Sequence, residues 1–350
     1  MTQTSRGFAA HSPTEALVPF GFERRDPRPD DVVIEILYCG VCHSDLHTAR
    51  NDWGGTVYPV VPGHEIVGRV VSVGAEAKRF KAGDQVGVGC LVDSCKQCAS
   101  CKHGHENYCP KMVGTYSGKD LRDGLPTYGG YSDRIVVTES FVLKMPDGLD
   151  LKGAAPLLCA GITMWSPLMH WKVGPGTNLA ITGLGGLGHM GLKLGKALGA
   201  NVTLFTRSPG KEDDARRLGA DRVVLSSDAG QMKAVRGAFD VIIDTVPYVH
   251  DINVYVPTLA TSGTLVLVGY LGPLEPALNS VPLILGRKAV AGSVIGGIAE
   301  TQEMLDFCGK HRITSDIEMI AMNEINGAYE RMLKSDVKYR FVIDLASLGR

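Results

Sequence analysis

The stretch NLAITGLGGLGHMGLKLGKALGANVTLFTRS, residues 178–208, decides the fold of this chain. It begins as an apolar strand, passes through a glycine-rich turn, continues with helical spacing and ends in a second strand. Gly183, Gly185 and Gly188 have G-x-G-x-x-G spacing and lie between the first strand and the helix. In that context the glycines permit a tight turn, the approach of a pyrophosphate and close packing of helix on strand. The stretch therefore predicts a dinucleotide-binding unit.

The end of the second strand indicates which dinucleotide is bound. A carboxylate about 20 residues after the first glycine would bind the ribose hydroxyls of NAD. No acid occurs there before Glu212, whereas Arg207 can stack on adenine or pair with a 2′-phosphate. This pattern favours NADP(H) over NAD(H); the alternative is that Arg207 is a solvated turn residue. The predicted cofactor contacts in this unit are Gly183, Gly185, Gly186, Leu187, Gly188, Thr206, Arg207, Ser208 and Lys211.

The segments that follow residue 208 continue the alternation of strands and helices. Short apolar runs at 239–246, 263–270 and 289–297 are separated by helical stretches. Because strands that alternate with helices pair in parallel, this region predicts an open, doubly wound parallel sheet.

The segments outside this unit have a different character. Residues 31–146 contain short strands bounded by glycine, which is typical of a compact, barrel-like β domain. After residue 297 the chain reads as a helix at 299–311 and then as helix, turn and strand at 325–345. We therefore expect an α/β protein in which a β-rich domain accompanies the parallel-sheet domain.

Composition sets limits on function. The chain has 350 residues, enough for two domains, and a formal net charge of −1, so no strong global field attracts nucleic acid or anionic lipid. The N-terminus lacks the apolar stretch of a signal peptide. Residues 153–171 lack charged side chains, but two prolines and a glycine interrupt them, so we expect a buried helix and turn at a domain junction rather than a membrane span. These features predict a soluble cytoplasmic protein that binds neither nucleic acid nor membrane.

Four of the nine cysteines lie in one polar loop, SCKQCASCKHGHENYC, residues 94–109. Their gaps of two, two and seven residues let Cys95, Cys98, Cys101 and Cys109 surround one ion. Zinc with four thiolate ligands has no position open for a substrate, so we interpret this loop as a structural zinc site. The alternatives are free surface thiols, a redox relay or a nucleic-acid-binding zinc ribbon; Glu106 and the near-neutral chain argue against the ribbon.

A second set of possible metal ligands comes from three separate motifs. CGVCHSDLH contributes Cys42, PGHEIVG contributes His64, and LLCAGIT contributes Cys159. Three protein ligands with one open position are typical of a catalytic zinc site, and Glu65 could serve as a transient fourth ligand. Taken singly, each cysteine could equally be a core residue.

Together these motifs resemble the zinc-dependent medium-chain alcohol dehydrogenases. The resemblance is strongest to the cinnamyl alcohol dehydrogenase type and its bacterial NADP-dependent aldehyde reductases, and it covers essentially the whole chain. It implies a GroES-like catalytic domain at residues 1–155 and 297–350, and a Rossmann domain at residues 156–296. It also implies two zinc ions per chain, a small aldehyde or alcohol substrate and a homodimer formed near residues 286–297.

The resemblance also implies roles for individual residues. Ser44 would hydrogen-bond the substrate oxygen, His47 would continue the proton relay to solvent, and Asp45 would orient His64. Further cofactor contacts would come from His43, Thr163, Ile295 and Arg340. Two rival functions remain open: an NAD-dependent polyol-type dehydrogenase, and a non-enzymatic NADPH-binding redox sensor on the same scaffold.

Overall fold

The computed structural model describes residues 3–349 and divides into two compact units. Unit 1 consists of Met1–Cys159 together with Gly296–Arg350, and unit 2 consists of Ala160–Ile295. Unit 2 is therefore an insertion in the chain of unit 1.

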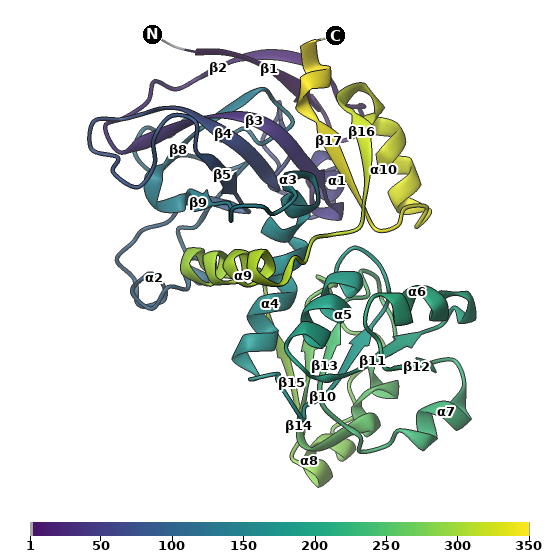
Figure 1. Cartoon of the computed structure of the whole chain (residues 1–350). Coiled ribbons are helices and arrows are strands. Elements are labelled where there is room, and N and C mark those ends of the chain that lie inside the picture. The colour runs from purple at the N-terminus through teal and green to yellow at the C-terminus, as the bar shows by residue number, and fades with distance from the viewer. Residues whose placement is uncertain (1–2, 350) are drawn as a thin grey trace. The chain divides into compact units, whose positions relative to one another are not determined.

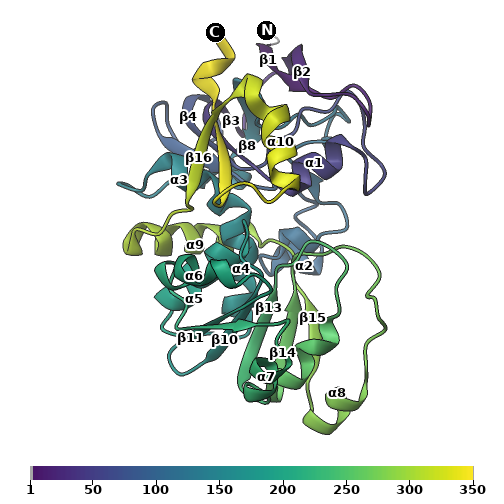
Figure 2. The ribbon, with the colours of Figure 1, turned by 90° about the vertical axis from the view of Figure 1, so that its right-hand side faces the viewer.

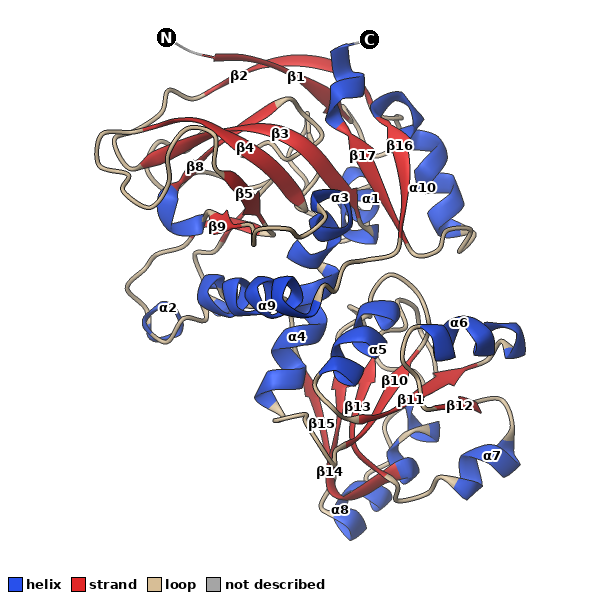
Figure 3. Ribbon diagram, viewed as in Figure 1, coloured by secondary structure: helices blue, strands red, loops and turns tan. Residues whose placement is uncertain are grey.

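Unit 2 is built on a six-stranded parallel sheet with the strand order β12-β11-β10-β13-β14-β15 (Figure 3). This confirms the doubly wound sheet expected from the sequence, with the first strand of the glycine motif at its centre. The strands are β10 (Asn178–Thr182), β11 (Asn201–Thr206), β12 (Arg222–Leu225), β13 (Phe239–Asp244), β14 (Leu259–Leu267) and β15 (Ala289–Gly292). The helices are α4 (Ala160–His170), α5 (Gly188–Ala197), α6 (Glu212–Arg217), α7 (Ala229–Ala234) and α8 (Val281–Gly286).

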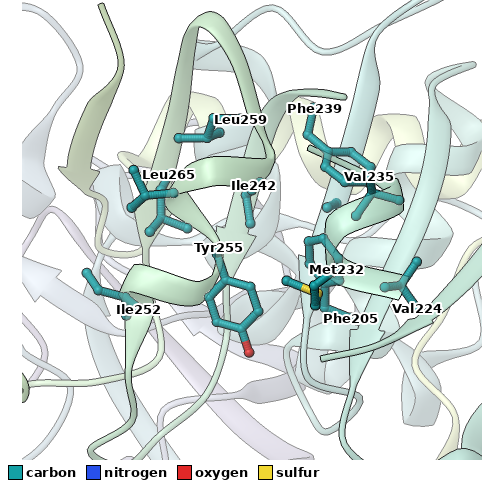
Figure 4. Close-up of a cluster of buried hydrophobic side chains, with 12 residues drawn as sticks. Phe205, Val224, Met232, Val235, Phe239, Ile242, Ile252, Tyr255, Leu259 and Leu265 are labelled. Atoms are coloured by element: carbon teal, nitrogen blue, oxygen red, sulfur yellow. The ribbon is translucent and has the colours of Figure 1, made fainter. Parts of the chain in front are cut away.

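A cluster of buried apolar side chains packs within unit 2 and includes residues of the sheet strands (Figure 4). Phe205, near the end of β11, is fully buried, and its ring packs against Phe239 and Tyr255 with centroid separations of 5.2 and 5.4 Å. Because the core fixes Phe205, it also fixes the point at which Thr206 and Arg207 leave the sheet. Arg207, the residue expected to distinguish NADP(H) from NAD(H), therefore directly follows a strand that the core holds in place.

Unit 1 contains a seven-stranded sheet with the order β16-β17-β3-β4-β5-β9, and β8 also pairs with β3 (Figure 1). All of these pairs are antiparallel except β16 with β17. The sheet strands are β3 (Asp31–Val41), β4 (Ile66–Val73), β5 (Gln85–Val88), β8 (Arg134–Thr138), β9 (Leu143–Lys144), β16 (Ile317–Ala321) and β17 (Arg340–Asp344). The helices are α1 (His43–Ala49), α2 (Ala99–Lys102), α3 (Leu151–Ala154), α9 (Ile298–His311) and α10 (Ile325–Leu333).

Two small two-stranded sheets of unit 1 were not expected from the sequence. They are β1 (Gln3–Ala9) with β2 (Val18–Arg24), and β6 (Leu91–Asp93) with β7 (Val113–Gly114). The strands of the second sheet are too short for periodicity to reveal them. In both views β1 and the stretch after β17 lie at the same end of the unit (Figures 1 and 2).

The uncharged segment at residues 153–171 forms the end of α3, a short 3-10 helix and α4, and most of α4 is buried. The unit boundary falls within it, between Cys159 and Ala160. Among the described residues, no helix has both the length and the apolar character that a membrane crossing requires.

Candidate functional site

Four buried side chains from three segments of unit 1 converge on one point. The ligand atoms of Cys42, His64, Glu65 and Cys159 all lie within 4.8 Å of one another. Cys42 follows β3 and His64 precedes β4; these strands pair antiparallel, which brings the two residues to the same end of the sheet. Cys159 follows the 3-10 helix at Ala155–Leu158. The structure thus brings together the residues that the sequence grouped as a catalytic metal site.

The spacing of the two cysteines fits a zinc ion. Their sulfur atoms are 3.9 Å apart. For thiolates about 2.3 Å from a tetrahedral zinc ion, the expected separation of two sulfurs is about 3.8 Å. The pKa of Cys42 lies well below its ordinary value because of its hydrogen bond with Cys159, and Arg340 lowers it further, although burial opposes both effects. The site therefore favours a thiolate, which is the form that binds metal.

Asp45, which is fully buried, holds His64 in place. Its Oδ1 accepts hydrogen bonds from Nδ1 of His64 at 2.9 Å and from the backbone N–H of Gly63 at 3.0 Å. Its Oδ2 accepts from the backbone N–H of Cys42 at 2.9 Å and from the hydroxyl of Tyr131 at 3.1 Å. Because Nδ1 donates to a carboxylate, Nε2 keeps its lone pair for a metal. Asp45 thus fixes both the orientation and the tautomer of His64.

Glu65 belongs to the ligand group, and only one of its two carboxylate oxygens has a hydrogen-bond partner among the described residues. Its Oε1 pairs with the buried guanidinium of Arg340, while Oε2 is buried and has no hydrogen-bond partner among the described residues. Burial raises the pKa of Glu65 to about 7, although the charge of Arg340 opposes the rise. A buried oxygen with no partner is costly unless a ligand or metal satisfies it. This arrangement suits the expected transient ligand and gives Arg340, expected as a cofactor contact, a partner within unit 1.

Gly40 provides the space that Glu65 occupies. A Cβ atom at position 40 would lie 1.8 Å from Oε2 of Glu65, which no real contact allows. Gly40 belongs to β3, so the absence of its side chain lets the carboxylate lie directly against the strand.

The cysteine loop forms a second compact group of ligands. The ligand atoms of Cys95, Cys98, Cys101 and Cys109 lie within 4.8 Å of one another, and no disulfide joins them. The sulfur of Cys101 is 3.9 Å from that of Cys95 and 3.5 Å from that of Cys98, near the tetrahedral spacing. Hydrogen bonds from the backbone N–H groups of Gln97 and Cys98 lower the pKa of Cys95 to about 6, whereas burial raises the pKa of Cys101 to about 11. Without an ion the loop therefore favours a thiolate at Cys95.

The expected proton relay lies on α1. The hydroxyl of Ser44 is 3.7 Å from the sulfur of Cys42, so it borders the metal site. Nδ1 of His47 lies 2.7 Å from Oδ2 of Asp52, and its ring lies 5.2 Å from that of Trp53. Sequence reasoning did not identify Asp52 as a partner of His47. Because a carboxylate holds Nδ1, Nε2 of His47 is the nitrogen available to exchange a proton.

Two tyrosines near the metal ligands were also missed. Tyr131 is fully buried and donates to Asp45, whereas the ring of Tyr116 lies 5.7 Å from that of His64. Both come from segments far along the chain from the motifs. No spacing rule connects them to the ligands, so only the folded chain reveals them.

The glycine turn of unit 2 has the geometry that phosphate binding requires. Gly183 has a φ of +88°, which is a left-handed conformation suited to glycine. A Cβ atom at Gly188 would lie 2.0 Å from the carbonyl oxygen of Gly183, whereas one at Gly185 would meet nothing within 4 Å. The third glycine is therefore required for packing, and the second leaves open space. The turn leads into α5, and the N–H groups at the N-terminus of such a helix are suited to bind an anion.

Basic groups surround the end of β11. Nζ of Lys211 donates to the carbonyl of Leu184 in the glycine turn at 3.0 Å. Nη2 of Arg207 donates to the hydroxyl of Tyr248 at 2.9 Å, and the guanidinium carbon lies 5.7 Å from the centre of the tyrosine ring. Tyr248 follows β13 and was not expected from the sequence. Thr206, through Oγ1, accepts from the backbone N–H of Ser208 at 3.1 Å.

The remaining predicted cofactor contacts belong to both units. His43 begins α1, and Arg340 begins β17 in unit 1. Thr163 is buried in α4 of unit 2. Ile295, at the end of unit 2, has a φ of +36°, which is unusual for a β-branched residue. Their approach to a common cofactor stays a prediction.

Comparisons with known proteins agree with these features. The alcohol dehydrogenase GroES-like domain matches residues 28–147, and the zinc-binding dehydrogenase model matches residues 186–310. The chain is 53% identical to the aldehyde reductase YahK of Escherichia coli (strain K12), with 98% of this chain and 99% of that protein covered. It is 54% identical to a probable mannitol dehydrogenase of Medicago sativa, with 97% and 95% covered.

A solved structure is also similar throughout. The crystal structure of CAD from Helicobacter pylori, complexed with NADP(H), has 44% sequence identity and a TM-score of 0.92. The alignment covers 99% of each chain. The similarity therefore extends over both units.

Proposed function

Because the chain belongs to the zinc-dependent medium-chain alcohol dehydrogenases, we propose that it interconverts a primary alcohol and an aldehyde with NADP(H). In the direction of reduction, aldehyde, NADPH and a proton give alcohol and NADP⁺. The substrate we propose is aromatic or of medium chain length. The observation that supports this most strongly is the convergence of Cys42, His64 and Cys159 with Glu65, whose ligand atoms all lie within 4.8 Å of one another.

The residues of unit 1 would bind the metal and transfer a proton between solvent and the substrate oxygen. Cys42, His64 and Cys159 would bind the catalytic zinc, and the loop cysteines would bind a second zinc with a structural role. When bound, the catalytic zinc would polarise the substrate oxygen and NADPH would supply the hydride. Ser44 would hydrogen-bond the substrate oxygen and exchange its proton with it. In reduction His47, held by Asp52, would relay a proton from solvent to Ser44, and in oxidation the same relay would run in reverse.

Unit 2 would bind the cofactor. The glycine turn at 183–188 would contact the pyrophosphate, and Thr206, Arg207, Ser208 and Lys211 would contact the 2′-phosphate. The absence of an acid between residues 201 and 211 supports NADP(H) over NAD(H). On this proposal residues 1–155 and 297–350 form the catalytic domain and residues 156–296 form the cofactor domain, with His43, Thr163, Ile295 and Arg340 as further cofactor contacts.

A polyol substrate is the second candidate, and the name of the Medicago sativa relative favours it. A redox sensor without catalysis would be supported by a missing ligand or a missing proton donor, but Cys42, His64, Cys159 and Ser44 are all present. A panel of aromatic aldehydes, aliphatic aldehydes and polyols, assayed with NADPH and NADH, separates the three functions. We expect the highest kcat/KM with an aldehyde and NADPH; a preference for a polyol with NADH would contradict the proposal.

Substitution of the ligands tests the metal assignment. Cys42→Ser and His64→Ala are expected to abolish turnover while NADPH still binds, because the cofactor contacts lie elsewhere. Wild-type turnover in either variant would refute the assignment.

We also propose a cytoplasmic homodimer. β15 is an edge strand of the parallel sheet, and such strands present unpaired backbone groups to a second chain. The neighbouring α8 exposes Ile284 and Leu285, which are 76% and 83% accessible. Exposed apolar side chains beside an unpaired strand edge favour association. Nine cysteines without a disulfide suit a reducing compartment.

A further inference from the structure

Arg207 is not a free side chain in unit 2. It donates to the hydroxyl of Tyr248 at 2.9 Å, and its guanidinium carbon lies 5.7 Å from the centre of that ring. Tyr248 itself is 50% exposed, so it reaches the surface and is not a core residue. A guanidinium has five N–H donors, and this hydrogen bond uses one of them. The others remain available to a ligand.

Tyr248 is in turn anchored to the centre of the sheet. Its carbonyl oxygen accepts from Nδ1 of His250 at 2.9 Å, and Nε2 of His250 lies 2.8 Å from Oδ2 of Asp244. Asp244 is buried at the end of β13, next to the first strand of the glycine motif. The loop that carries Tyr248 is therefore fixed to the carboxyl end of a central strand, the edge at which doubly wound sheets bind their ligands.

The two contacts of His250 favour its protonated form. A carbonyl oxygen and a carboxylate are both acceptors, and only an imidazolium can donate to both of them. The hydrogen bond to Asp244 raises the pKa of His250, with burial opposing the rise. The buried carboxylate of Asp244 is thus paired with His250. Hydrogen bonds then connect His250 to the carbonyl of Tyr248, and the hydroxyl of Tyr248 to Arg207.

We propose that Tyr248, anchored through His250 to Asp244, is a positioning residue that holds Arg207 ready for the 2′-phosphate of the cofactor. This inference rests on the proposed role of Arg207 in NADP(H) binding and extends it to a residue outside the β11 motif. Arg207 would otherwise lose side-chain freedom when the phosphate binds. A side chain that is already ordered loses less entropy, so the phosphate is bound more tightly.

The experiment measures binding without catalysis. Titration calorimetry compares adenosine 2′,5′-bisphosphate with adenosine 5′-monophosphate, because the two probes differ only in the 2′-phosphate. We expect Tyr248→Phe, which keeps the ring, to weaken the bisphosphate about twofold to threefold, and Tyr248→Ala to weaken it about fivefold to tenfold. His250→Ala should weaken binding of the bisphosphate by a factor similar to that of Tyr248→Ala, because it removes the anchor of the tyrosine loop. The affinity for the monophosphate should stay unchanged in all three variants.

Two controls identify the origin of any change. Tyr108→Phe removes a hydroxyl from a tyrosine in unit 1 that is 49% exposed, and it should leave both affinities unchanged. In an Arg207→Ala background, Tyr248→Ala should cause no further loss, because the two residues act through one interaction. The inference is overturned if Tyr248→Ala leaves the bisphosphate affinity intact or raises it. If Arg207→Ala itself has no effect, then the proposed role of Arg207 fails as well, so the two failures are distinguishable.

Discussion

The imidazole of His64 and the carboxylate of Asp45 are joined by a hydrogen bond of 2.9 Å between Nδ1 and Oδ1. Both side chains are buried, so neither can replace this partner with water. The contact determines which imidazole nitrogen faces the metal position, and it couples the chemistry of the site to α1, the helix that contains Asp45.

Replacement of Asp45 by Asn should weaken zinc binding at the catalytic site. An amide cannot hold the histidine with a full negative charge, and loss of such a partner typically costs about 10- to 100-fold in metal affinity. Competition with a chromophoric chelator measures the change. Asp52→Asn is the matched control, because Asp52 also hydrogen-bonds a histidine but lies outside the ligand set. Equal zinc affinities in the two variants would contradict the role given to Asp45.

Gly40→Ala should destabilise unit 1. The new Cβ would lie 1.8 Å from Oε2 of Glu65, so the carboxylate must move away from Arg340 or the strand must shift. Overpacking of this kind costs about 1–3 kcal/mol in the free energy of unfolding. Denaturant titration checks the value. Gly21→Ala, at a strand glycine with nothing within 4 Å of the added atom, should cost far less. A Gly40 variant as stable as the Gly21 variant would show that the space is not needed.

Cys98→Ser should remove one zinc and leave the other. The four-cysteine loop would lose a ligand, whereas Cys42, His64 and Cys159 are untouched. Metal analysis is expected to fall from about two zinc ions per chain to about one, with a lower thermal midpoint, because structural zinc contributes directly to folding. Cys308→Ala, at a buried cysteine outside both groups, should retain both ions. Two zinc ions in the Cys98 variant would refute the structural site.

Arg207→Asp should move cofactor preference towards NADH. The substitution replaces a donor for the 2′-phosphate with a carboxylate that can accept from ribose hydroxyls. Loss of charge-assisted hydrogen bonds predicts about a 10- to 100-fold fall in the ratio of kcat/KM for NADPH to that for NADH. Arg217→Asp, on the exposed side of α6, is the control for a general change of charge. The same ratio in both variants would argue against Arg207.

Those parts of the site that lie in short motifs could be predicted from the sequence. Cys42, His64 and Cys159 each belong to a local pattern, and the glycine turn has a spacing that follows from backbone sterics. The parallel sheet could also be predicted, because most of its strands are apolar runs that helical stretches separate. In these cases the residues that determine the structure are close together in the sequence, so a local pattern is enough to predict it.

The remaining parts depend on contacts between distant segments. Tyr131 reaches Asp45 across 86 positions of sequence, and Arg340 reaches Glu65 across 275. Tyr248 meets Arg207 only because β11 and β13 both pair with β10. A tyrosine or arginine has no periodicity that marks such a contact. These residues become visible only when the strands are placed in register.

The central claim is that Cys42, His64 and Cys159 hold a metal ion. An anomalous difference map at the zinc absorption edge, from crystals of the purified full-length protein, tests it most directly. We expect two peaks per chain, one within bonding distance of the two sulfurs and Nε2 of His64, and one among the four loop cysteines. A single peak confined to the loop would contradict the claim.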